Sequence, residues 1–116
     1  MLSTQIIPGD GVSIATLGSD DTFVVLRYRS LGAVIELTTE MTIYFPVTGA
    51  YDSEEIGRQI CDDEDDAINA AVDLQRAARK RLAELDVIDV YSDPDDYAEA
   101  LELHFERAAA VAMAAE

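Results

Sequence analysis

The chain has 116 residues and a formal net charge of -16, from 24 acidic and eight basic residues. This charge disfavours direct binding to nucleic acid or to an anionic membrane surface, because those partners attract lysine and arginine patches. Hydrophobic residues make up 49% of the chain, which excludes a disordered acidic tail, since such segments contain few apolar residues. We therefore expect one folded domain, and a basic protein is the kind of partner that its charge would attract.

Cysteine usage and the N-terminal residues bear on the compartment. Cys61 is the single cysteine, so the chain forms no internal disulfide and needs no oxidising environment. Residues 1–5 contain no basic side chain and begin no long apolar run. This predicts neither a secretory signal peptide nor a membrane-spanning helix.

The first part of the chain, residues 1–50, predicts an antiparallel β-meander. Short segments rich in β-branched and aromatic residues alternate there with glycine, serine and aspartate at turns. The predicted strands are Val12 to Leu17, Thr22 to Arg29, Ala33 to Leu37 and Met41 to Val47. In the last strand the odd-numbered residues are apolar, which predicts one face on the core, and Pro46 should lie at an edge or a strand end.

The second part, residues 51–116, predicts helices. Asp52 or Ser53 can cap a short helix through Ile60, although Gly57 weakens it by about 1 kcal/mol relative to alanine. A longer amphipathic helix is predicted from about Asp63 to Leu85, because apolar residues recur there at helical spacing. The residues of this apolar face are Ala67, Ile68, Ala71, Val72, Leu74, Ala78, Leu82 and Leu85.

The last elements complete the predicted fold. The apolar run Val87 to Tyr91 predicts an extra strand, and Asp93 with Pro94 predicts the cap and first turn of a final helix that reaches nearly to the C-terminus. The fold class is α+β: a single domain, residues 1–116, with an N-terminal antiparallel sheet of four to five strands followed by two main C-terminal helices.

The acidic run of residues 62–66 invites a calcium hypothesis, because Asp62, Glu64 and Asp66 have the alternating spacing of an EF-hand loop. Ala67 stands where that loop needs glycine, and Asp73 stands where a bidentate glutamate is expected. Acids at the start of a helix also meet its positive dipole end. We therefore predict a helix start, with no metal and no cofactor.

Catalytic signatures are weak. His104 is the single histidine and falls on the apolar stripe of the last predicted helix, where a lone histidine is usually a packed group. A Cys61 and His104 pair could support nucleophilic catalysis only with an orienting group and an oxyanion site, which the spacing does not supply. We expect a protein that is not an enzyme.

Two segments are candidate contact surfaces with other protein subunits. Arg27 and Arg29 flank Tyr28 on a predicted strand and form either a patch for an acidic neighbour, such as another copy, or a solubilising sheet edge. Beyond Arg107 the helix is apolar all round, so its end is buried in the domain, frays, or packs on another subunit, the alternative we favour. The predicted interface residues are Arg27, Arg29, Ala109, Val111, Ala112 and Met113.

The acidic residues of the second part have two explanations. The aspartate-rich and lysine-poor composition resembles that of proteins from extreme halophiles and their viruses, in which surface carboxylates keep a protein hydrated in molar salt. Alternatively, the carboxylates imitate nucleic-acid phosphates, as in anti-restriction and anti-CRISPR proteins, and inhibit a DNA-binding defence enzyme. The acidic surface in question comprises Asp62, Asp63, Glu64, Asp65, Asp66, Asp95, Asp96, Glu99, Glu102 and Glu106.

A further similarity lies in the stretch from Ser53-Glu54-Glu55-Ile56 through the acidic run Asp62 to Asp66 and on to Leu85. It resembles the opening helices of tailed-phage head-tail adaptor proteins, over about a third of the chain. The resemblance implies a ring-forming virion component without catalytic residues. Together these observations predict a structural protein of the head, neck or tail of a tailed virus with a halophilic host, present in the virion or the host cytoplasm as a homo-oligomer or particle.

Overall fold

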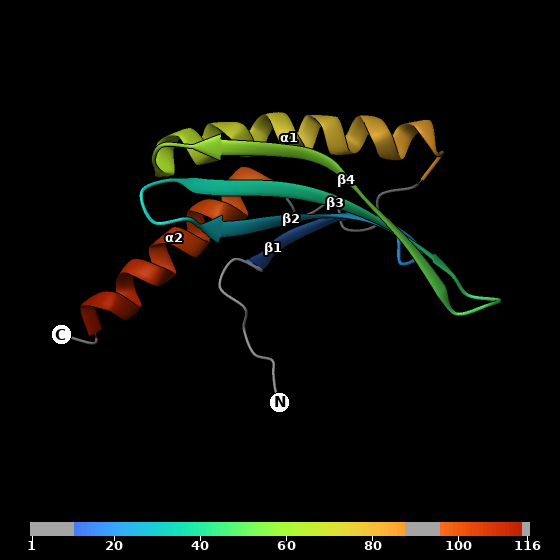
Figure 1. Cartoon of the computed structure of the whole chain (residues 1–116), viewed down its shortest axis with the longest axis horizontal. Helices are drawn as coiled ribbons and strands as arrows, with labels where there is room; N and C mark the ends of the chain where they lie inside the picture. The colour runs from blue at the N-terminus through green and yellow to red at the C-terminus, as the bar shows by residue number, and fades with distance from the viewer. Residues whose placement is uncertain (1–10, 88–95, 115–116) are drawn as a thin grey trace.

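The fold is a four-stranded antiparallel sheet with two helices on one of its faces (Figure 1). The computed structural model describes residues 11–87 and 96–114, without the side chains of residues 111–114. The strands are β1 (Val12–Gly18), β2 (Thr22–Ser30), β3 (Ile35–Phe45) and β4 (Ala50–Cys61), in the order β1-β2-β3-β4. The helices are α1 (Glu64–Glu84) and α2 (Tyr97–Ala114). The predicted α+β class and the antiparallel meander are confirmed.

β3 is one continuous strand where the sequence predicted two. Residues 38–40, expected to separate the strands, are Thr-Thr-Glu, and they stay extended because β3 is hydrogen-bonded to β2 on one side and to β4 on the other. Thr39 is fully buried, and its hydroxyl donates a hydrogen bond to the Gly57 carbonyl of β4 at 3.4 Å. Pro46 lies just after β3, as predicted for a strand end.

β4 replaces the short helix predicted from Asp52 or Ser53 to Ile60, and that prediction was wrong. The segment pairs with the whole of β3, so the ladder of backbone hydrogen bonds outweighs the weak helical propensity of its acidic residues. The missed signal is the turn between the strands. Gly49 has a positive φ of 75°, its N–H donates to the Phe45 carbonyl at 2.7 Å, and Tyr44 pairs with Tyr51 across the hairpin.

Only glycine fits at position 57, because side chains of α1 and β3 occupy the space that a Cβ atom would take. A Cβ atom at this position would lie 2.8 Å from the Thr39 hydroxyl oxygen and 2.9 Å from a methyl carbon of Leu74. The register between β3 and β4 also shifts next to Gly57, between Thr39 and Glu40, where Ile56 is the extra residue. The glycine that appeared to weaken a helix therefore allows α1 to approach the sheet closely.

The core lies between the sheet and the two helices. β1, β2 and β3 contribute large apolar side chains, while α1 contributes mostly alanines, which let its backbone lie close to the strands. The buried set includes Leu17, Val24, Leu26, Leu37, Met41, Ala67, Ala70, Ala71, Leu74, Ala78, Leu82, Leu101 and Phe105. From the predicted face of α1, Val72 and Leu85 are instead 43% and 39% exposed, because they lie beside the contact stripe.

The helix starts follow capping chemistry. Asp63 caps α1 by accepting a hydrogen bond from the Asp66 amide at 2.9 Å, and the first turn carries Glu64, Asp65 and Asp66, as predicted for a helix start. α2 begins at Tyr97 and is capped by Asp96, which accepts from the amides of residues 98 and 99, while the predicted cap at Asp93 lies outside the described residues. The predicted strand from Val87 to Tyr91 lies outside the described residues apart from Val87.

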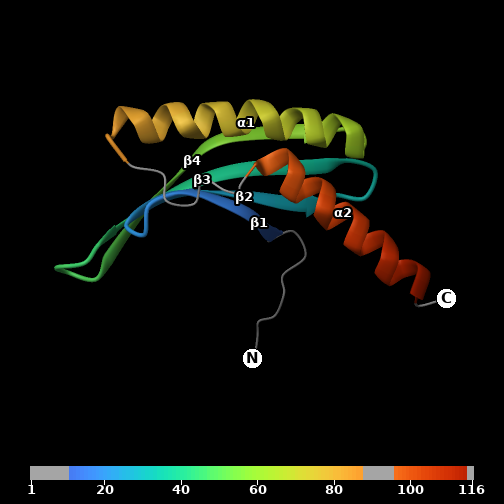
Figure 2. The same cartoon turned by 180° about the vertical axis from the view of Figure 1, so that it is seen from behind.

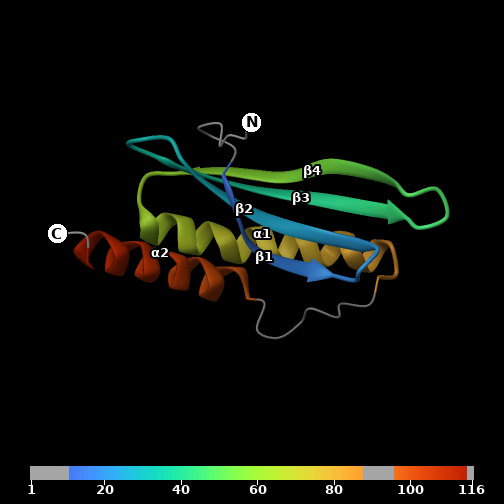
Figure 3. The same cartoon turned by 90° about the horizontal axis from the view of Figure 1, so that it is seen from below.

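Tyr97 ties the start of α2 to the sheet and to α1. Its side chain is fully buried, and its hydroxyl donates a hydrogen bond to the Val24 carbonyl of β2 at 2.8 Å. Its backbone amide donates to the Gln75 side-chain oxygen of α1 at 2.6 Å. Figures 2 and 3 show α2 alongside α1 and next to the β1 side of the sheet.

We expect Tyr97→Phe to lower the free energy of unfolding by about 1–2 kcal/mol, because the buried hydroxyl is lost and the Val24 carbonyl loses that donor. Urea unfolding measures the change. Tyr51→Phe is the matched control, since the Tyr51 side chain is 67% exposed and should change stability by less than about 0.5 kcal/mol. Equal effects of the two substitutions would contradict this role for Tyr97.

Candidate interaction surfaces

The sheet face opposite the helices is open and electrically balanced over its central residues. β2 is an interior strand, so Arg27 and Arg29 do not lie at a sheet edge as predicted. They point to the open face, because the alternating neighbours Val24 and Leu26 are buried beneath the helices. Strand register brings Arg58, Glu36, Glu40 and Glu55 to the same face, giving three basic and three acidic groups.

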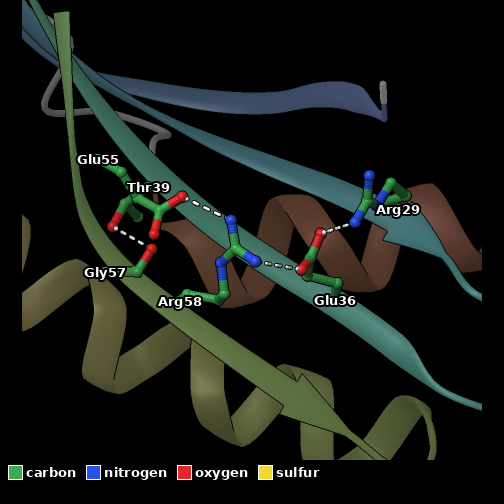
Figure 4. A network of polar contacts seen from close by, with 6 residues as sticks. All are labelled: Arg29, Glu36, Thr39, Glu55, Gly57 and Arg58. Atoms are coloured by element: carbon green, nitrogen blue, oxygen red, sulfur yellow. Dashed lines mark hydrogen bonds and ion pairs between the residues drawn. The ribbon is translucent and has the colours of Figure 1, made fainter. Parts of the chain in front are cut away.

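Glu36 is the centre of an ion-pair network on this face (Figure 4). Its carboxylate lies 2.7 Å from an Arg29 nitrogen and 3.0 Å from an Arg58 nitrogen, and its side chain is only 6% exposed. Arg58 also contacts Glu55 at 2.8 Å. The hydrogen bond to Glu55, followed by the charges of Glu36 and Glu55, raises the pKa of the Arg58 guanidinium. The network joins β2, β3 and β4 by charge, and it engages Arg29 within the domain.

This network was not predicted from the sequence. The Arg29 and Glu36 pair is symmetric about the turn of residues 31–34, so counting outward from that turn would have found it. Arg58 could not be placed, because β4 was predicted to be helical. Arg27 makes a longer contact, 4.0 Å to Glu40, and both side chains are about two-fifths exposed.

The second predicted interface, the end of α2, projects past the sheet (Figure 1). Leu101 and Phe105 are the last buried residues of α2 among those whose side chains are described. Residues 106–110, which include Ala109, are exposed, so no described residue of the chain covers this part of the apolar end. Val111, Ala112 and Met113 continue the helix, with side chains outside the described set.

The hairpin between β3 and β4 projects at the opposite end of the molecule (Figure 1). Phe45 is 44% exposed and Val47 is 96% exposed, so the predicted core face of this strand was wrong beyond Ile43. The strand runs past the end of α1 (Figure 1), so the helical layer does not cover its apolar side there. The Tyr44 and Tyr51 rings contact each other with centroids 5.0 Å apart and stiffen this arm. We call residues 44–51 the hairpin arm.

The acidic surface predicted from the sequence is solvated wherever the structure describes it. Residues 62–66, Asp96, Glu99, Glu102 and Glu106 are all exposed, and Asp95 lies outside the described residues. Within residues 11–87 and 96–114, no group of three or more histidine, cysteine or acidic side chains is arranged to hold a metal ion. In the same part of the chain, neither helix is long and apolar enough to cross a membrane.

Cys61 and His104 have separate packing environments. Cys61 is buried at the end of β4, opposite Ile35. Burial, then the charges of Asp66, Asp62 and Asp63, raises the pKa of its thiol, whereas nucleophilic cysteines have lowered pKa values. The His104 ring packs against Tyr28 with centroids 5.0 Å apart and also contacts Phe105. Both residues therefore behave as packed groups.

Comparison with known proteins gives no match to a protein family, to a curated protein or to a solved structure.

We expect Glu36→Gln to lower the free energy of unfolding by about 1–2 kcal/mol, because the nearly buried amide no longer balances two guanidinium charges. Urea unfolding in 2 M KCl measures the change. Glu40→Gln is the matched control, and we expect less than about 0.5 kcal/mol, because the Glu40 contact is long and half exposed. A smaller loss for Glu36→Gln than for Glu40→Gln would contradict the network's role.

Cys61 should react slowly with iodoacetamide at pH 8, at least tenfold more slowly than the same chain in urea. The pKa of its thiol is higher in the folded state than in the unfolded state. The resulting stability is therefore present below the ordinary thiol pKa of about 8.5 and is lost as pH rises through the folded-state value. Cys61→Ala should flatten that decline in unfolding free energy. Equal alkylation rates with and without urea would contradict the protection of the thiol in the folded state.

Proposed function

We propose that this chain is a non-enzymatic assembly protein, a component of the head, neck or tail of a tailed virus with a halophilic host. The observation that carries the proposal is the pair of uncovered apolar elements at the two ends of the molecule, the hairpin arm and the end of α2 (Figure 1). A projecting element that leaves apolar side chains exposed is suited to a contact with another subunit.

The charge distribution supports an assembly that works in concentrated salt. The exposed acidic residues keep the surface hydrated, while the projecting elements carry few charges. Residues 41–51 form the longest run without a charged residue, eleven positions, and residues 108–115 form another of eight. Contacts through these runs avoid placing acidic groups against each other.

The viral part of the proposal rests on composition and on the resemblance to head-tail adaptor proteins. The resemblance now rests mainly on α1 with its acidic first turn, because Ser53 to Ile56 lie in β4 and not in a helix. Virion proteins also act through shape and repeated contacts, as the two projecting elements suggest for this chain.

The second candidate is a DNA-mimic inhibitor, and one observation favours it. Every described residue of the predicted acidic surface is exposed and available to a basic protein. The two functions differ in their response to salt. Binding of a mimic to a basic enzyme weakens as salt rises, whereas self-assembly of a chain of charge -16 through apolar elements strengthens.

We expect the chain to be mainly monomeric in 0.1 M KCl and oligomeric in 2 M KCl, because the Debye length falls from about 10 Å to about 3 Å or less. Sedimentation velocity measures the mass. Ala109→Glu should weaken assembly at least tenfold, because it places a charge on the uncovered end of α2, whereas Ala77→Glu on the exposed side of α1 is the matched control. A chain that stays monomeric and folded at both salt concentrations would overturn the assembly proposal in favour of the mimic.

A further inference from the structure

A pocket of about 480 Å³ lies between β1 and α2. Its apolar lining residues are Ile14, Ala100 and Leu103, and its charged lining residues are Glu99, Glu102, Glu106 and Arg107. The volume falls within the range of about 300–1,000 Å³ typical of ligand pockets, so it can hold several side chains. Leu103 is 40% exposed, which makes it a large apolar group without full cover among the described residues. We call this site the α2 pocket.

The hairpin arm has the chemistry that the α2 pocket accepts. Phe45 and Val47 supply exposed apolar side chains, and the arm carries no charge that the three glutamates could repel. Tyr51 is 67% exposed, and its hydroxyl can donate a hydrogen bond to a carboxylate. An arm with apolar side chains and O–H donors thus matches a pocket with apolar residues and carboxylate acceptors.

The two surfaces lie at opposite ends of the same molecule. In Figure 1 the hairpin projects at one end of the longest axis, and α2 runs toward the other end. In the view from behind in Figure 2 the same separation is clear. A copy can therefore offer its arm to one neighbour and its pocket to another. Such a heterologous contact repeats from copy to copy and produces a ring or a filament.

We infer that the occupant of the α2 pocket is the hairpin arm of a second copy of this chain, so that copies join head to tail. The inference rests on the proposed assembly function and names its partner and its contact. A second copy can offer the arm without bringing acidic groups to the three glutamates of the pocket, because residues 44–51 carry no charge. The arm lies within the longest uncharged run of this acidic chain, residues 41–51, and one contact covers exposed apolar groups on both copies. The pocket extends to Glu106 and Arg107, at the start of the uncovered end of α2, so the arm would also approach that end.

Two substitutions test the contact from its two sides. Val47→Glu places a charge on the arm at a side chain that is 96% exposed, and Leu103→Glu places one in the α2 pocket. Neither change removes a buried group, and circular dichroism checks that both variants fold. Ala33→Glu, in the exposed turn between β2 and β3, adds the same charge away from both surfaces. We expect each test variant to weaken assembly at least tenfold in 2 M KCl, and the control to assemble like the wild-type chain.

Mixing the two variants separates head-to-tail contact from symmetric contact. Val47→Glu chains keep an intact pocket, and Leu103→Glu chains keep an intact arm. An equimolar mixture should therefore form a species of two chains that grows no further, as measured by sedimentation velocity. Failure of the mixture to pair when each variant alone is monomeric would overturn the head-to-tail contact.

The remaining outcomes distinguish this inference from the proposed function. If the wild-type chain assembles and both test variants assemble equally well, the arm-to-pocket contact is overturned, while assembly through another surface stands. If only Leu103→Glu assembles normally, the pocket is not the site of the arm, and the inference is again overturned. If the wild-type chain stays monomeric in 2 M KCl, the assembly function itself fails, and the inference fails with it.

Discussion

The pairing of β3 with a strand on each side is the constraint on which the rest of the molecule depends. β3 is extended from Ile35 to Phe45, so its side chains alternate between the core and the open face of the sheet. Leu37, Thr39 and Met41 point toward the helices, while Glu36 and Glu40 meet the arginines on the other side. The same strand continues beyond the helices and becomes one side of the hairpin arm.

The helical layer is held close to this sheet by small residues and a few directed hydrogen bonds. The alanines of α1 and the missing side chain at Gly57 allow the helix to lie near β3 and β4. Tyr97 then fixes α2 through Val24 and Gln75. The single cysteine allows no internal disulfide, so this close packing and the buried hydrogen bonds hold the helices to the sheet without a covalent link.

Local patterns predicted most of the elements, and long-range pairing decided the rest. Alternation, turn residues and capping acids were sufficient for β1, β2, α1 and most of α2, because each leaves its signal within a few neighbouring residues. β4 was missed because its acidic segment resembles a capped helix and forms a strand only through pairing with β3. The Glu36 network and the hairpin arm both depend on that strand, so neither could be predicted without it. The acidic surface and the apolar end of α2 could be found from composition and helical spacing alone.

The balance of charges on the open sheet face has an electrical consequence for the whole molecule. Three arginines and three glutamates cancel on that face, while the described acidic residues of the two helices lie on the other side of the sheet. Among residues 11–87 and 96–110, the excess of negative charge therefore lies on the helical side, and these residues set up an electric dipole across the sheet. The field of these described residues favours an orientation in which the sheet face, and not the helices, is turned toward a negatively charged surface.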